Sequence, residues 1–268
     1  MNPVFNDRQR GLSLIELMVA MLIGLFLMLG VTQIFINNQK SYLFQQGQIG
    51  NQENGRFTLA LLSQELLKAG YRSDPKTTLT ADTSLTNCSF NAGAGVTTAS
   101  ASSTTALCIQ YQSTNKADVT CQGTALSDAN KALIVTPYGQ VNPKVVERIA
   151  LDATTNSITC TTSAGSQQLV TGVRDLRFEY GTGAGNDTKT ITAWTPTPSA
   201  SATIAAVRYN VLMQSPGTSN LRDSTSVASA ALTDWNARYG TTYGTTAADQ
   251  TSIYQVVQGT IMIRNQMQ

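Results

Sequence analysis

The first pattern along the chain is an apolar run of about 25 residues, 12–36. Only four polar side chains interrupt it, Ser13, Glu16, Thr32 and Gln33. As an α-helix this run would be roughly 37 Å long, which is enough to cross the hydrocarbon core of a bilayer. Arg8 and Arg10 precede the run. Positive charge on that side predicts a cytoplasmic N-terminus, with the rest of the chain outside the cytoplasm.

Helical spacing continues beyond the apolar run. Residues 37–69 contain no proline, and apolar side chains recur at helical intervals at Phe57, Leu61, Leu62 and Leu66. Gly70 and then Pro75 are typical of a helix end. We therefore expect one helix over 12–69, about 87 Å long when fully formed.

Two further features belong to this expected helix. Glu65 and Lys68 are three residues apart, so their side chains can pair on one face. Glycines occur in the middle of the segment, where each costs up to about 1 kcal/mol relative to alanine; they are Gly47, Gly50 and Gly55. Local bending or fraying is expected there.

Short β-branched or aromatic runs follow an irregular connection over 76–106. They predict strands at 107–111, 132–137, 145–151, 173–180, 206–213 and 254–265. In 173–180 Leu176, Phe178 and Tyr180 alternate with charged residues, which is typical of a strand with one buried face. The amphipathic face at 57–66 needs an apolar partner. These features predict an α+β fold, in which a long N-terminal helix packs on an antiparallel β-sheet.

Two long inserts interrupt the predicted sheet, at 181–200 and at 214–251. Both are rich in Gly, Ser and Thr, so we expect surface loops. They contain most of the large aromatic residues of this region, Trp194, Trp235, Tyr239 and Tyr243. These rings either anchor the loops on the sheet or form a partner surface, and whether the loops bind a partner or an ion is left open.

Composition narrows the function classes. Charged residues make up only 13% of the chain and the net charge is +2, or +1 for the part after residue 11. Neither value indicates a protein whose main partner is nucleic acid, so no direct nucleic-acid binding is expected. Histidine is absent, which excludes Ser-His-Asp and Cys-His catalysis and imidazole zinc sites. We expect no enzyme, no catalytic residue, no metal site and no cofactor.

The four cysteines all follow the apolar run, at Cys88, Cys108, Cys121 and Cys160. Their spacings match no CxxC metal or redox motif. An even number in an exported domain predicts two disulfides. We favour Cys88–Cys108 and Cys121–Cys160 because each joins neighbours along the chain. The other two pairings, and four free buried thiols, remain alternatives.

The stretch "GLSLIELMVAMLIGLFLM" raises the question of why a carboxylate is kept near the start of an apolar helix. It resembles the class III leader and N-terminus of type IV prepilins, in which a glycine is followed at fixed spacing by a glutamate and an apolar helix. Gly11 matches the residue before cleavage and Glu16 matches the glutamate. Leu12 stands where phenylalanine is usual. The resemblance implies that a prepilin peptidase cuts between Gly11 and Leu12 and that Leu12 is then N-methylated.

Three later stretches extend the resemblance to the PilW family of minor pilins. They are the region 37–71, "GVRDLRFEYG" at 172–181 and "VVQGTIMIRNQ" at 256–266. The resemblance implies a type IV pilin-like fold and no catalysis. It implies four parts: a cleaved leader at 1–11, a transmembrane and assembly helix at 12–36, its amphipathic continuation at 37–74, and an exported β-rich domain at 75–268.

The resemblance also implies where the protein acts and with what. It would lie in the inner membrane as a single-pass protein before assembly and at the pilus tip on the cell surface afterwards. Its partners would be the prepilin peptidase, other minor pilins, the major pilin and a PilY-type tip adhesin. The expected role is to initiate pilus assembly, in support of twitching motility, adhesion or DNA uptake.

Several alternatives stay open at this point. Glu16 could pair with the N-terminal amine of a neighbouring subunit, or could simply be hydrated at the membrane interface. The chain could instead be a J-type minor pseudopilin of a type II secretion system, which shares the leader, helix and sheet. A DNA-binding pilin would need a basic, aromatic-rich stripe, and a membrane-anchored enzyme would need a nucleophile motif that the sequence lacks.

Overall fold

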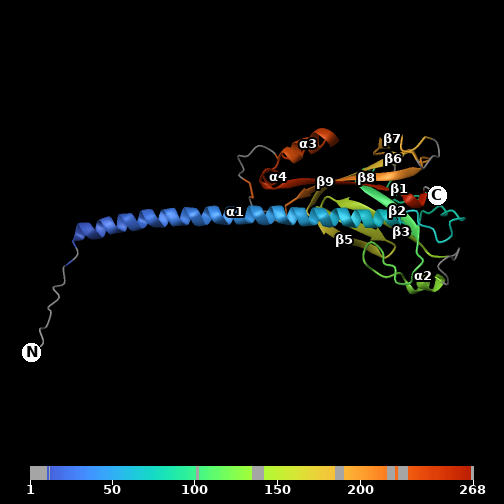
Figure 1. The fold of residues 1–268 in the computed structure, drawn as a ribbon, viewed down its shortest axis with the longest axis horizontal. Coiled ribbons are helices and arrows are strands. Elements are labelled where there is room, and N and C mark those ends of the chain that lie inside the picture. The colour runs from blue at the N-terminus through green and yellow to red at the C-terminus, as the bar shows by residue number, and fades with distance from the viewer. Residues whose placement is uncertain are drawn as a thin grey trace, which may run out of the picture. The chain divides into compact units, whose positions relative to one another are not determined.

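The computed structural model describes residues 11, 13–100, 103–134, 142–184, 190–215, 221–222 and 229–266. The chain divides into two compact units, Met1–Gln46 and Gly47–Gln268. One continuous helix, α1 (Leu14–Lys68), runs through both (Figure 1). The prediction of a single helix over 12–69 is therefore confirmed to within two residues at each end.

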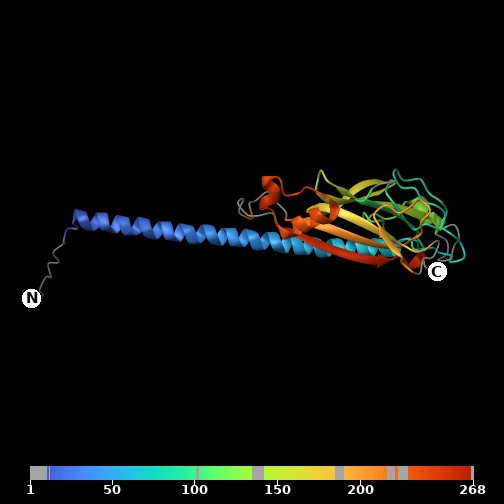
Figure 2. The same ribbon diagram turned by 90° about the horizontal axis from the view of Figure 1, so that it is seen from above.

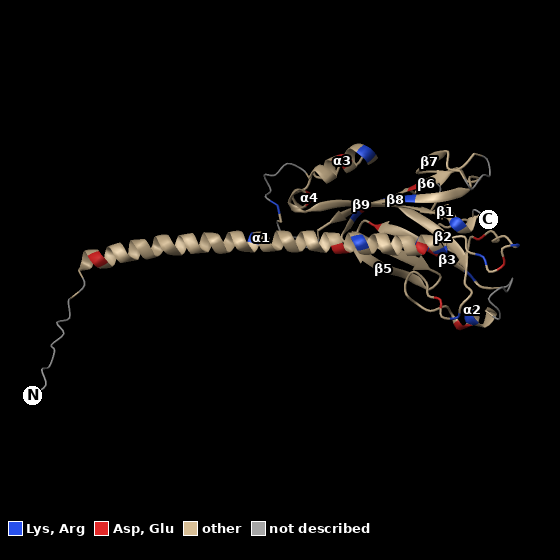
Figure 3. Ribbon diagram, in the orientation of Figure 1, with Lys and Arg blue, Asp and Glu red and all other residues tan. Residues whose placement is uncertain are grey.

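The first unit contains the apolar part of α1. Every described residue from Ser13 to Gln46 is exposed within the chain. No charged residue occurs between Glu16 and Lys40, and Figure 3 shows this half of the helix almost free of charge. Length and composition make α1 able to cross a membrane.

The second unit contains two antiparallel sheets where the sequence predicted one. The first has the order β1 (Val96–Thr98), β2 (Ala106–Gln112), β3 (Lys144–Asp152), β4 (Ser157–Thr162) and β5 (Gly165–Thr171). The second has the order β7 (Ala193–Thr195), β6 (Val173–Thr182), β8 (Ile204–Gln214) and β9 (Tyr254–Met262). The α+β pilin-like architecture, with a long N-terminal helix and an antiparallel β domain, is confirmed (Figure 2).

The core is shared by the second half of α1 and both sheets. Leu62 and Leu66 are fully buried, and they cluster with apolar side chains of β2, β3, β6 and β8, among them Ile109, Ile149 and Phe178. A backbone bond from the Phe178 N–H to the Thr104 carbonyl, 2.8 Å, links β6 to the segment that leads into β2. The apolar face of the helix therefore packs against the two sheets, as its amphipathic sequence predicts.

The buried stripe of the helix differs from the predicted one. Phe57 is 54% exposed. Most of the buried positions are small or polar and only two are apolar; they are Gly47, Asn51, Gly55, Thr58, Leu62, Glu65 and Leu66. The Asn51 side-chain amide donates to the distant Ile253 carbonyl (2.8 Å), and the Thr58 hydroxyl donates to the Asn54 carbonyl one turn earlier (2.7 Å).

Two of the glycines explain how closely the helix approaches the domain. A Cβ atom at Gly55 would lie 3.0 Å from Val257 Cγ1 of β9, and one at Gly47 would lie 2.6 Å from Leu221 Cδ1. The contact at Gly47 is shorter than real Cβ contacts, and the one at Gly55 is tighter than nine in ten of them. The glycines do not interrupt the 55-residue helix. They let its backbone lie close to the rest of the domain.

Three predicted segments differ in type. The strand expected at 132–137 is wrong in its described part, because Ala132 and Leu133 end a short helix, α2 (Asp128–Leu133). The Ser127 hydroxyl caps that helix by accepting from the Asn130 N–H. The insert 214–251 is not only loop, since it contains α3 (Ala230–Tyr239) and α4 (Ala247–Thr251). The insert 181–200 contributes strand β7, and β9 is followed by a 3-10 turn, η1 (Arg264–Gln266).

The inserted helices are fastened to the outer face of β6 by charged groups. Asp175 is 1% exposed and accepts hydrogen bonds from the indole N–H of Trp235 (2.9 Å) and from Arg177. Glu179 accepts from Arg238 of α3 (3.2 Å). The face that the sequence assigned to solvent is therefore partly covered, and Trp235 acts as an anchor for the insert.

Candidate assembly site

The residues singled out by the leader motif lie at the start of α1. Gly11 precedes the helix, and Leu12 lies outside the described residues. Glu16 is in the first turn. Its Oε2 accepts from the Ser13 N–H at 3.4 Å, in the S-x-x-E arrangement of a capping box. At that length the bond is weak, so within the single chain Glu16 has only a weak local partner and is exposed to solvent.

Apolar side chains surround the helix immediately after Glu16. Within the chain they are largely exposed, for example Leu25 at 62% and Phe26 at 79%. A helix that is apolar on all sides must be covered by lipid or by other apolar helices. Glu16 thus lies at one end of a surface about 25 residues long that water cannot cover favourably.

All four cysteines lie in the second unit, where they form two disulfides. Cys88 pairs with Cys108 (Cα–Cα 5.8 Å) and ties the connection before β1 to β2. Cys121 pairs with Cys160 (Cα–Cα 6.1 Å) and ties the loop after β2 to β4. The pairing favoured from the sequence is the one that the structure contains.

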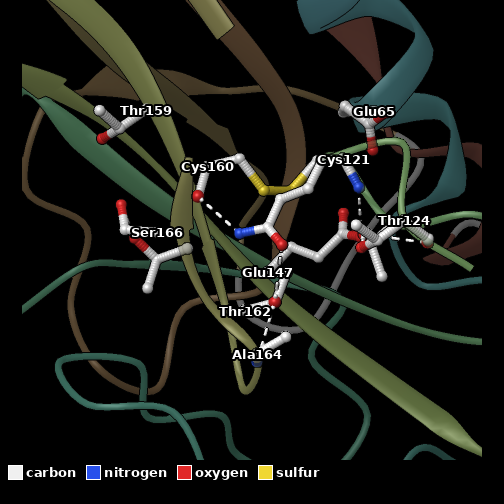
Figure 4. The surroundings of a disulfide bond; sticks show 12 residues. Glu65, Cys121, Thr124, Glu147, Thr159, Cys160, Thr162, Ala164 and Ser166 are labelled. Atoms are coloured by element: carbon white, nitrogen blue, oxygen red, sulfur yellow. Dashed lines mark hydrogen bonds between the residues drawn. A yellow bond between two sulfur atoms is a disulfide. The ribbon is translucent and has the colours of Figure 1, made fainter. Parts of the chain in front are cut away.

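A buried pair of acids lies beside the second disulfide (Figure 4). Glu147 of β3 is fully buried, and its Oε1 accepts from the Tyr111 hydroxyl (3.0 Å) and the Cys121 N–H (2.9 Å). Glu65 of α1 is 3% exposed and pairs with Lys68 at 2.8 Å. Burial, together with the negative charge of Glu65, raises the pKa of Glu147 to about 7.

This acid pair connects three parts of the domain: the last turns of α1, strand β3 and the disulfide-bonded loop. A proton on Glu147 can be shared with the Glu65 carboxylate, which also favours the neutral form of Glu147. The sequence predicted the Glu65–Lys68 pair and the structure confirms it. The burial of Glu147 could not be predicted, because a charged residue inside "VVERIAL" looks like an ordinary outward-facing strand position.

Among the described residues, no group of three or more His, Cys, Asp or Glu side chains is placed to hold a metal ion. Other ionisable side chains of the domain form acid–base pairs between segments, as Arg238 of α3 does with Glu179 of β6.

Two family models match the chain. One describes the type IV pilus-assembly protein W and matches residues 139–265. The other describes the prokaryotic N-terminal methylation motif and matches residues 6–32, which include Gly11, Leu12 and Glu16. Together the two matches support a type IV pilus minor pilin similar to PilW. No curated protein and no solved structure gives a significant match.

The two models match different parts of the chain. The methylation-motif match covers the second half of the leader and most of the apolar run, while the PilW match covers β3 to β9. A type IV pilin with a prepilin leader implies processing by a prepilin peptidase and association with other pilins. The leader and the apolar helix indicate anchoring in the membrane and incorporation into a pilus.

Proposed function

We propose that this chain is a minor pilin of the tip complex, which primes assembly of a type IV pilus and so supports twitching motility, adhesion or DNA uptake. The observation that carries the proposal is the placement of Glu16. Among the described residues before Lys40 it is the only charged side chain, at one end of an exposed helical surface that is largely apolar as far as Ile36. In hydrocarbon such a charge would cost roughly 3 kcal/mol.

The proposed mechanism offsets that cost in the assembled state. Cleavage between Gly11 and Leu12 would create an amine, methylated on Leu12, and the carboxylate of Glu16 would pair with the amine of a neighbouring pilin. In a bundle of apolar helices, loss of either partner leaves the other charge buried and unpaired. The pair therefore sets the axial register between subunits. The other minor pilins, the major pilin and a PilY-type tip adhesin are the proposed partners.

The first test replaces Glu16 with alanine. We expect Glu16→Ala to be cleaved and to remain in the membrane, because the glycine and the apolar run are intact. Surface pili, counted by electron microscopy, should fall strongly. Glu53→Ala is the matched control, since Glu53 is an exposed acid on the same helix. Pilus numbers equal to wild type in Glu16→Ala would refute the pairing role.

The second test concerns processing. A bulky residue at Gly11, as in Gly11→Leu, should block the peptidase and leave the full-length precursor in the membrane fraction. Mass spectrometry of the wild-type protein should find methylated Leu12 as its first residue. Detection of Met1 on the assembled wild-type protein would contradict cleavage at this site.

A further inference from the structure

A pocket of about 430 Å³ lies where α3 covers the outer face of the second sheet. Asn210 of β8 and Val256 of β9 line it from the sheet, and Asp234, Trp235, Arg238 and Tyr239 line it from α3. Its volume falls within the range of roughly 300–1,000 Å³ that is common for small-molecule sites. The assembly role proposed above makes no use of it.

The side chain of Asn210 suggests that this pocket binds a ligand, because its polar atoms have no partner in the protein. Asn210 is 1% exposed, and both its amide nitrogen and its amide oxygen are buried without a hydrogen-bond partner. Leaving one such group unsatisfied costs about 1–3 kcal/mol, and nearly all buried polar groups in proteins are paired. Arg177, which lies opposite Asn210 on β6, does not supply the missing hydrogen bonds, because the Arg177 guanidinium is bound to Asp175 and Thr104.

The aromatic and aliphatic residues of the lining give the pocket an apolar wall. The indole N–H of Trp235 is occupied by Asp175, so this residue offers the pocket only ring carbons. Val256 is 40% exposed and adds an apolar surface. The Tyr239 hydroxyl is a second buried polar group without a hydrogen bond. The pocket therefore combines an apolar wall with three unpaired polar groups: an amide nitrogen that donates, an amide oxygen that accepts, and a phenol hydroxyl that does both.

Charge limits the class of ligand. Arg238 already pairs with Glu179 (3.2 Å), and Asp234 adds a negative group on the exposed side of α3. The lining itself carries one positive and one negative side chain, so it holds no surplus charge to attract a phosphate or a polyanion. A neutral ligand is favoured.

The position of Asn210 argues against an extended peptide. β8 is hydrogen-bonded to β6 on one side and to β9 on the other. At Asn210 the floor of the pocket therefore offers no free strand edge, which is what extended peptides use for main-chain pairing. The edge strand on this side of the sheet is β9, which contributes Val256 to the lining.

We propose that this pocket binds a neutral saccharide. Vicinal hydroxyls both donate and accept, so one pair can satisfy the amide oxygen and the amide N–H of Asn210 together. The C–H face of a sugar ring would pack against Val256 and the ring carbons of Trp235 and Tyr239. The proposal is independent of the assembly function, because none of these residues belongs to α1.

The test uses the full chain in a polyoxyethylene detergent, since alkyl glycoside detergents would present sugar headgroups to the site. The probes are methyl glycosides of glucose, galactose, mannose and N-acetylglucosamine, together with lactose and maltose. Saturation-transfer NMR and titration of tryptophan fluorescence measure binding. We expect saturable binding of at least one probe. Absence of binding by the whole panel would overturn the proposal.

Variants locate the binding. Asn210→Leu should weaken it by at least about tenfold without lowering the melting temperature, because the change removes an unsatisfied buried amide. Thr260→Val, on the exposed outer face of β9 and outside the pocket lining, is the matched control and should bind as wild type. If Asn210→Leu does not fold, Ala231→Phe, which fills the pocket from α3, decides. Undiminished binding in the folded variant would overturn the proposal.

Discussion

At the scale of single residues, the buried acid Glu147 is the most informative group in the domain. Its Oε1 has two donors, while its Oε2 is buried without a hydrogen-bond partner in the deprotonated form. The charged groups that face it are Glu65 and Lys68 from α1, and the Tyr111 hydroxyl faces it from β2. A protonated Glu147 fits this environment better than a carboxylate.

The pKa of Glu147 gives a direction for stability against pH. The folded pKa of about 7 lies above the ordinary value of 4.5, so the folded protein holds this proton more tightly than the unfolded chain. The free energy of unfolding should therefore fall as pH rises from about 4.5 to about 7, by roughly 1–3 kcal/mol. Glu147→Gln should remove that part of the pH dependence and be the more stable form at pH 8.

Denaturation of the full chain in detergent at a series of pH values measures this effect. The difference between wild type and Glu147→Gln isolates the one group, because all other titrating groups are common to both proteins. Parallel pH profiles for the two proteins would show that Glu147 ionises as freely in the folded state as in the unfolded one.

At the scale of elements, the contact between α1 and β9 depends on the absence of a side chain. Gly55 lies opposite Val257 in the fully formed part of the helix. In the sequence this glycine looked like a weakness, since it lowers helix propensity. In the structure it sets the distance between helix and sheet, so its packing role outweighs its propensity cost.

Gly55→Leu should separate these two roles. A larger side chain would overlap Val257, and such overpacking costs about 1–3 kcal/mol even though leucine is the better helix former. The melting temperature of the full chain, followed by tryptophan fluorescence, should fall. Gly24→Leu is the matched control, because a Cβ there meets nothing within 4 Å. A melting temperature at or above wild type in Gly55→Leu would show that the sheet can yield.

The agreement between sequence and structure follows the strength of each local pattern. The helix and strands β3, β6, β8 and β9 could be predicted, since their apolar residues recur at the period of the element. Strands β4 and β5 could not, because "SITCTT" and "GSQQLVT" are polar and β5 is largely exposed. The helix α3 is short and buries only Leu232 and Trp235, and it lies in a segment rich in Gly, Ser and Thr, so its segment resembled a loop.

The candidate sites follow the same logic. Gly11 and Glu16 could be found from the sequence because the motif is local and its spacing is fixed. The unpaired Asn210 and the buried Glu147 could not, since their environments are assembled from segments far apart in the chain. For Asn210, helix α3 lies about twenty residues downstream in an insert whose helical spacing is confined to Leu232, Trp235 and Tyr239.

At the scale of the whole molecule, the two units have opposite solubility requirements. The first unit exposes an apolar helix surface, and the second has its own core and two disulfides. Such a chain suits residence in a bilayer followed by transfer into a bundle of similar helices. A tip-priming pilin and a J-type pseudopilin would both satisfy this requirement, so a genetic experiment is needed to distinguish them.

Deletion of the gene in two backgrounds makes that distinction. Without a priming pilin the number of surface pili should fall. Some pili should return when retraction is also blocked, because retraction then no longer removes the few pili that still start to assemble. Pili are counted by electron microscopy and secreted enzymes are assayed in the medium. Intact pili with lost secretion would identify a pseudopilin instead.

The weak bond between the Ser13 N–H and Glu16 has a consequence for the timing of assembly. The first peptide N–H groups of α1 give that end of the helix the positive pole of its macrodipole, equivalent to roughly half an elementary charge. Cleavage after Gly11 would add an ammonium group directly before this pole, and the two positive ends repel. The precursor has a peptide bond there instead, and its nearest positive side chain is Arg10. Proteolysis would thus add a charge to a helix end that is already partly positive, which is electrostatically unfavourable until a carboxylate from another subunit approaches. The order of events, cutting first and assembly second, would be built into the helix itself.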